Sequence, residues 1–135
     1  MKAMLTINSL EPHIQSLPQE LQKSARYSLE TWLAIIHQNQ LTLNPTDKLF
    51  QSIPKVWCCS EFISESCNRK PELLVDLVNS GDLDKPYDEQ TYLSKLAEFE
   101  LADEAELMRQ LRHFRRREMV RIAWRDLAGW ADLDE

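Results

Sequence analysis

Glycine is scarce in this sequence: only Gly81 and Gly129 occur among 135 residues. A loop that cradles phosphate needs several glycines close together, so the sequence excludes Walker-A and dinucleotide-binding motifs. Sandwiches and barrels also use many glycine turns, which argues against an all-β fold. The length suits one domain, and 43% apolar residues are enough to bury a core without a disulfide or metal.

Apolar residues recur instead at three- and four-residue intervals, the period of a helix. This pattern predicts a long helix over 18–39 and another segment over 71–81, opened by a proline and closed by a glycine. Residues 44–47 are typical of a turn and of a helix start, which predicts a new helix after the first one. Ser52-Ile53-Pro54 then repeats the start signal, which predicts a break between two short helices at that point.

The last third of the chain contains the main loop and the longest helix of the prediction. Three aspartates and a proline predict a loop over 82–88. Asp103 and Glu106 form a capping-box variant, so the longest helix should run from near Glu104 to near Ala128. The prediction is an all-α, irregular array of about five to seven helices, with residues 1–135 forming one helical portion.

The charge balance limits the partners that the chain can have. Sixteen basic and 22 acidic residues give a net charge of −6, which disfavours nucleic acid and anionic membranes. The apolar runs are too short to cross a bilayer, and the first residues lack a signal-peptide pattern. Cys58, Cys59 and Cys67 are therefore expected as free thiols that pack as small buried hydrophobic residues.

Seven arginines between positions 109 and 125 depart most from an ordinary helical bundle. Glu118 is the only acid among them, so this segment carries +6 and the remainder of the chain −12. Such asymmetry indicates either an interaction surface or pairing between the basic and acidic parts.

Helical geometry divides these arginines between two sides of the predicted helix. At about 100° per residue, Leu111, Phe114 and Ile122 fall on an apolar side, together with Leu107, and Glu118 lies among them. A buried carboxylate needs a partner, which predicts a structural ion network. Its members are Glu118, Arg115, Arg121 and Arg125. Arg109, Arg112 and Arg116 face the other way, and are either solvated or bind an anion or an acidic partner.

No catalytic constellation emerges from the remaining polar residues. His13, His37 and His113 are far apart in sequence and belong to no metal or nucleophile motif. The aspartates of the loop lack the ligand series of a calcium site. We therefore predict no catalytic residue and no metal ligand within this chain.

A family resemblance comes from the arginine-rich helix. Residues 114–126, Phe-Arg-Arg-Arg-Glu-Met-Val-Arg-Ile-Ala-Trp-Arg-Asp, resemble the N-terminal region of the bifunctional glutamine synthetase adenylyltransferase/adenylyl-removing enzymes. Residues 127–133 continue the likeness, and 56–62 and 71–74 resemble the same family upstream. The likeness therefore covers roughly Pro54 to the C-terminus.

The resemblance implies a large cytoplasmic nucleotidyltransferase of nitrogen metabolism. Such an enzyme transfers AMP from ATP to a tyrosine of glutamine synthetase, and removes it by phosphorolysis, releasing ADP. A PII signalling protein sets the balance, and Mg²⁺ is held by aspartates of a glycine-rich motif with Ser-Asp-x-Asp. This chain lacks that motif, and residues 130–135 resemble the start of a further helix. We therefore expect an inactive helical portion, with a structural or regulatory role, that precedes the catalytic core.

One alternative remains open from the residues themselves. The chain could be a non-enzymatic helical adaptor, whose basic helix face binds an acidic partner. A downstream Gly-Gly and Ser-Asp-x-Asp pattern in the reading frame would favour the enzyme over the adaptor.

Overall fold

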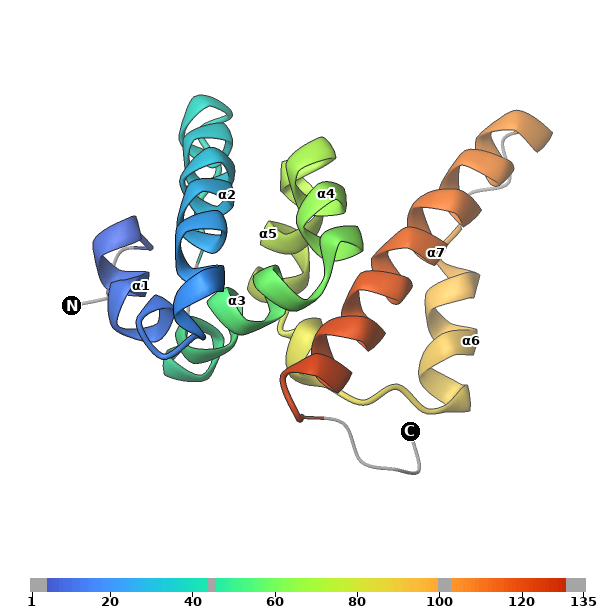
Figure 1. Cartoon of the computed structure of the whole chain (residues 1–135). Coiled ribbons are helices and arrows are strands. Elements are labelled where there is room, and N and C mark those ends of the chain that lie inside the picture. Colours follow the sequence, from blue (N-terminus) through green and yellow to red (C-terminus); the bar gives the residue numbers. More distant parts are fainter. Residues whose placement is uncertain (1–4, 44–45, 100–102, 131–135) are drawn as a thin grey trace.

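The computed structural model describes residues 5–43, 46–99 and 103–130, and within these ranges the protein is all-α (Figure 1). Seven α-helices and one short 3-10 helix follow one another without a strand in the described ranges. The predicted fold class, the number of helices and the position of the longest helix are confirmed. The helices are α1 (Ile7–Ile14), α2 (Gln19–Gln38), α3 (Asp47–Cys59), α4 (Glu61–Arg69), α5 (Pro71–Asn79), η1 (Asp82–Asp84), α6 (Glu89–Ala97) and α7 (Glu104–Leu127).

Helix α1 was not predicted, although the sequence carries its start signal. The Thr6 side chain accepts a hydrogen bond from the backbone N–H of Ser9, and the Ser9 side chain accepts one from the backbone N–H of Thr6. This reciprocal pair satisfies two donors that a helix start leaves open. Leu10 and Ile14 then bury one side of α1 against α2 and α3.

Helix α3 corrects the predicted break at Ser52-Ile53-Pro54. The helix continues through Pro54 to Cys59, and the chain turns at Ser60, whose side chain accepts a hydrogen bond from the N–H of Ile63. A proline removes one helical hydrogen bond, but Ile53 and Val56 beside it are fully buried. Burial of these neighbours holds the helix together where the local signal favours an end. The turn predicted at 44–47 lies partly outside the described residues.

The core is formed mainly by α1 to α5, with the C-terminal part of α7 completing it. Trp32 of α2 and Trp57 of α3 pack in a tilted arrangement, with ring centroids 5.0 Å apart. The Nε1–H of Trp57 donates to Ser28 Oγ at 2.8 Å. From α7, Val120 and Trp124 enter the same core with no exposed surface. The tryptophans thus fill the contacts between helices that are distant in sequence.

The segment between α5 and α7 is less deeply packed. Gly81, with φ +80°, ends α5 in a left-handed conformation that glycine adopts without strain. The predicted loop over 82–88 begins with η1 and becomes irregular only from Lys85. Helix α6 has no buried residue at all.

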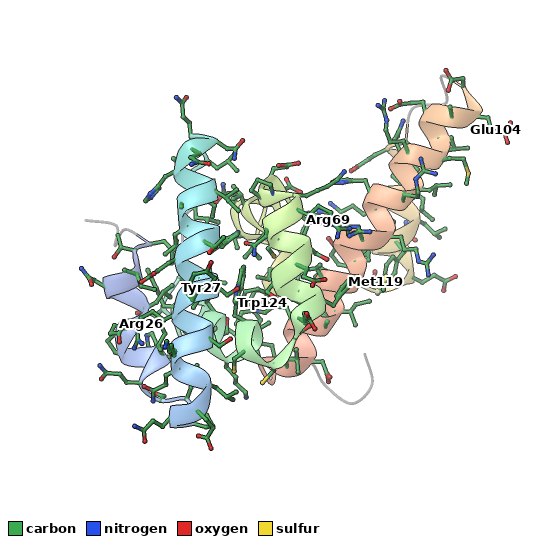
Figure 2. All side chains as sticks on the ribbon, turned by 45° about the horizontal axis from the view of Figure 1, so that its top comes forward. Arg26, Tyr27, Arg69, Glu104, Met119 and Trp124 are labelled. Atoms are coloured by element: carbon green, nitrogen blue, oxygen red, sulfur yellow. The ribbon has the colours of Figure 1, made fainter. Side chains whose placement is uncertain are left out.

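Helix α7 packs against the other helices only in its C-terminal half. All its buried residues lie between Arg117 and Arg125. Figure 1 shows the N-terminal end of α7 projecting beyond α4 and α5. In Figure 2, Trp124 lies among the packed helices and Glu104 at the projecting end. None of the helices in the described ranges has the length and hydropathy needed to span a membrane.

Candidate functional site

Arg117 is the centre of a cluster of charged and aromatic side chains between α5, η1, α6 and α7. Its guanidinium donates to Asp82 Oδ2 at 2.8 Å and to Asp76 Oδ2 at 2.9 Å. It also reaches the Tyr87 hydroxyl at 3.3 Å. Burial alone would lower the pKa of Arg117, but the bonds to Asp82, Tyr87 and Asp76 raise it above its ordinary value. Arg117 is therefore a fixed cation that joins α7 to two preceding elements.

Asp82 is the acidic counterpart of this arginine. Lys95 of α6 is its second cationic partner, at 3.3 Å from Oδ2. Burial favours the protonated carboxyl, yet the hydrogen bonds from Arg117 and Tyr87 and the charge of Lys95 lower the pKa of Asp82 to about 2. Its carboxylate thus stays charged and connects η1 with both α6 and α7.

Glu118 and Arg121 form a second, buried ion pair on the adjacent turn of α7. Arg121 Nε lies 3.0 Å from Glu118 Oε1, and Arg121 Nη2 lies 3.0 Å from Oε2. The Tyr92 hydroxyl of α6 donates to Glu118 Oε2 at 2.9 Å. Arg121 also donates to the Lys85 carbonyl at 2.6 Å, and its guanidinium lies 3.8 Å from the ring centroid of Tyr87. These contacts satisfy two charges that would be costly to bury alone.

The structure brings together two of the four residues expected in the ion network. Glu118 and Arg121 pair directly. Arg125 is buried but lies farther along the helix, where its guanidinium approaches the Trp130 carbonyl at 3.5 Å. The expectation for Arg115 is wrong: its side chain is exposed, and no ion pair to it occurs among the described residues. It lies on the side of α7 that faces away from the core.

The predicted apolar side of α7 is right only in part: Glu118 is buried as expected, and Leu107 and Phe114 are half-buried. Leu111 and Ile122 are exposed, as are Met108 and Met119. The inward side instead carries Val120 and Trp124 together with the charged residues. Leu111 is exposed because it lies on the part of α7 that precedes the first buried residue, Arg117. Ile122 is exposed because the core contacts the side of α7 that carries Val120 and Trp124.

The three arginines expected to face solvent or a partner differ in exposure. Arg109 and Arg112 are exposed, and Arg116 is half-buried. Arg109 pairs with Glu106 one turn earlier on the same helix. This leaves a basic border along α7 that is available to a partner.

The cluster does not fit a magnesium site. Mg²⁺ binds carboxylate and water oxygens, but the Asp82 and Glu118 carboxylates are already neutralised by arginines within 3.0 Å. Among the described residues, no group of three or more His, Cys, Asp or Glu side chains could hold a metal ion. What the cluster does chemically is to hold α6, η1 and α7 in one arrangement.

The cysteines agree only in part with the expectation of buried, inert thiols. Cys67 is buried, and burial raises its pKa to about 12. Cys59, however, is exposed and Cys58 half-buried, with their sulfur atoms 4.0 Å apart. Both follow the last buried residues of α3, where the helix reaches the surface. The pKa of Cys58 is raised to about 11. The largest cause is burial of its thiol, and the charge of the neighbouring Cys59 is the next largest.

Sequence reasoning missed Arg117 and the residues that bind it. Its position three and seven residues before Val120 and Trp124 places it on their side of the helix. That spacing could have assigned Arg117 inward, but arginine in a basic run favours solvent. Asp82 and Tyr87 give no such signal, because they meet Arg117 only through the fold.

Comparisons with known proteins give a consistent family assignment. The family described as "GlnE: Glutamate-ammonia ligase adenylyltransferase" matches residues 50–135, more than half of the chain. A bifunctional glutamine synthetase adenylyltransferase/adenylyl-removing enzyme of Nitrosococcus oceani is 42% identical over 127 residues, which are 93% of this chain and 13% of that protein. The protein of the same name in Thioalkalivibrio sulfidiphilus is 35% identical, over 96% of this chain and 13% of its own length.

A third relative of that name, from Pseudomonas aeruginosa, is 34% identical over 90% of this chain and 11% of its own length. The chain thus spans only a small part of these relatives. No solved structure matches it. The agreement between the family match and these relatives, over nearly the whole chain, shows that the chain belongs to the glutamate–ammonia ligase adenylyltransferase family.

Proposed function

We propose that this chain is the helical N-terminal portion of the adenylyl-removing half of an enzyme that controls glutamine synthetase. The enzyme would attach AMP from ATP to a tyrosine of glutamine synthetase, and remove it by phosphorolysis. The names of the relatives, which describe both adenylyl transfer and adenylyl removal, support this proposal. The resemblance in the arginine-rich helix further suggests Mg²⁺ as cofactor, a PII protein as regulator and the cytoplasm as location.

Within that enzyme, we assign the chain a structural role. The supporting observation is the cluster around Arg117 and Glu118, whose carboxylates are paired with arginines inside the fold. Phosphoryl and nucleotidyl transfer depend on metal ions positioned around the phosphates. Carboxylates that already neutralise guanidinium groups are poor ligands for such ions. The cluster instead supplies a rigid connection between helices.

The test compares the chain alone with a full-length chimera. In the chimera, this chain replaces the matching segment of the Nitrosococcus oceani enzyme. Both are incubated with adenylylated glutamine synthetase, inorganic phosphate and Mg²⁺, and ADP release is measured. The chimera should release ADP and the chain alone should not. ADP release by the chain alone would contradict the structural role, and a folded but inactive chimera would contradict the place assigned to it.

The adaptor hypothesis has one observation in its favour, the exposed basic border of Arg109 and Arg112 on α7. A basic surface can bind an acidic protein without any catalytic parent. The two hypotheses differ in the chimera: an unrelated adaptor would not sustain ADP release there.

A further inference from the structure

The outer side of α7 carries an apolar stripe that the described fold leaves open. Met108, Leu111, Met119 and Ile122 are 47%, 37%, 45% and 52% exposed. At about 100° per residue, these four positions fall within an arc of roughly 80° on the helix. The four side chains form two apolar pairs on one side of the helix, Met108 with Leu111 and Met119 with Ile122, and Arg115 lies between the pairs. Exposed apolar side chains gathered on one side of a helix often mark an interaction site.

None of the other helices that the structure describes covers this stripe. Val120 and Trp124, which face the core, lie on the opposite side of α7. A rotation that buried Leu111 or Ile122 would expose Trp124 and separate Arg117 from Asp82. Helix α6 adds two further exposed leucines, Leu93 and Leu96, and contributes no buried residue of its own. The stripe therefore needs an occupant from outside the described residues.

Charge limits what that occupant can be. Arg115 lies within the stripe, and Arg112 and Arg116 border it. Two copies of this chain meeting through the stripe would bring the same arginines face to face, because a twofold interface uses one patch twice. A fitting surface is apolar in the middle, with carboxylates at the edge.

The relatives supply such an occupant, since about seven-eighths of their length lies outside the matched segment. We propose that the stripe, with Arg115 inside it and Arg112 and Arg116 at its border, is the surface on which this portion docks to the rest of the enzyme. The inference rests on the proposed function, because it takes the remaining polypeptide as the partner. Hydrophobic burial would supply most of the affinity, and the arginines would set the orientation.

Hydroxyl-radical footprinting tests the docking without nucleotide or glutamine synthetase. The chain alone and the Nitrosococcus oceani chimera are labelled in parallel, with Met108 and Met119 as sensors because thioethers oxidise readily. Both sensors should be labelled about tenfold more slowly in the chimera. Tyr27, 74% exposed on α2 and away from α7 in Figure 2, should be labelled equally in both.

A matched pair of variants sharpens the test. The double variant Leu111→Asp/Ile122→Asp should restore labelling of Met108 and Met119 in the chimera, yet leave the melting of the isolated chain unchanged. Tyr27→Asp, which introduces the same charge at a more exposed position on another helix, should leave the protection in place. Loss of ADP release with intact protection would count against the proposed function and not against the docking surface.

Three results would overturn the docking proposal. The first is equal labelling of both methionines in the chain and in the chimera. The second is protection in the isolated chain that disappears on dilution, since this would make a second copy the occupant. The third is labelling of Trp124 in the chimera but not in the isolated chain. This result would mean that α7 leaves the core in the presence of the rest of the enzyme, and that the stripe is not its docking surface.

Discussion

Helices α1 to α5 and the pair α6–α7 are held by different chemistry. In the first region, α2 and α3 meet through leucines, isoleucines and the packed rings of Trp32 and Trp57. In the second, Val120 and Trp124 of α7 still enter the apolar core, but Asp82, Glu118 and two arginines connect α7 with η1 and α6, with tyrosines around them. Apolar contacts are non-directional and tolerate small shifts, whereas ion pairs with several hydrogen bonds require one arrangement. The comparison suggests that the first region supplies stability and the second supplies a defined geometry.

Removal of a large core side chain in the first region should have the greatest effect. Trp32→Ala deletes a fully buried indole and leaves a cavity beside Trp57. The expected loss in the free energy of unfolding is about 3–5 kcal/mol, measured by urea denaturation with circular dichroism. Tyr27→Ala on the exposed side of the same helix is the control. If Trp32→Ala lost less unfolding free energy than Glu118→Ala, the first region would not be the main source of stability.

Breaking the buried ion pair should come next. Glu118→Ala leaves Arg121 without its carboxylate and the Tyr92 hydroxyl without its acceptor. We expect a loss of about 3 kcal/mol, at the lower end of the scale for a broken buried pair. Glu118→Gln should be milder, since the amide keeps the shape and an acceptor. If Glu118→Ala melted with the wild-type midpoint, the pair would not hold α7 in place.

The ion pair between Asp82 and Arg117 of α7 should make stability depend on pH, which the apolar contacts of the first region do not. Because the pKa of Asp82 is lowered to about 2, its contribution is complete above the unfolded-state pKa of about 4. The contribution is lost as the pH falls from about 4 to about 2, and amounts to roughly 2 kcal/mol. Asp82→Asn should be less stable than wild type at neutral pH, and this difference should shrink over that interval. A difference that stays constant down to pH 2 would contradict the pairing with Arg117.

The smallest effects should come from the outer arginines. Arg109→Ala, Arg112→Ala and Arg116→Ala should each change stability by less than about 0.5 kcal/mol, because exposed ion pairs contribute little. Any effect on partner binding should weaken as added salt screens the charges. Thermal melts at low and high salt provide the measurement. A severe loss of stability from Arg116→Ala would mean that Arg116 takes part in the buried ion-pair cluster.

The sequence predicted helices far better than it predicted which side of them is buried. Capping signals such as Asp103 with Glu106 are local, so the start of α7 followed directly from them. The side of α7 that faces inward depends on contacts with α5 and η1. Arg117, for example, contacts Asp82 and Asp76, which are 35 and 41 residues away in the sequence. Leu111 looked like a core residue because no local signal shows where the packed half of a helix begins. The same limit hid Arg117, whose partners are assembled only by the tertiary fold.

The hydrogen bond from Trp124 Nε1 to Ser52 Oγ, 3.1 Å long, has a spectroscopic consequence. It ties the indole of α7 to α3, so the ring leaves its dry surroundings only if the two helices separate. Indole fluorescence shifts to longer wavelength when water reaches the ring, and the difference spectrum between wild type and Trp124→Phe isolates this one emitter. Trp32 and Trp57 report on the other region in the same sample. The chain thus carries its own optical signal for the separation of α7 from the core, with no added dye.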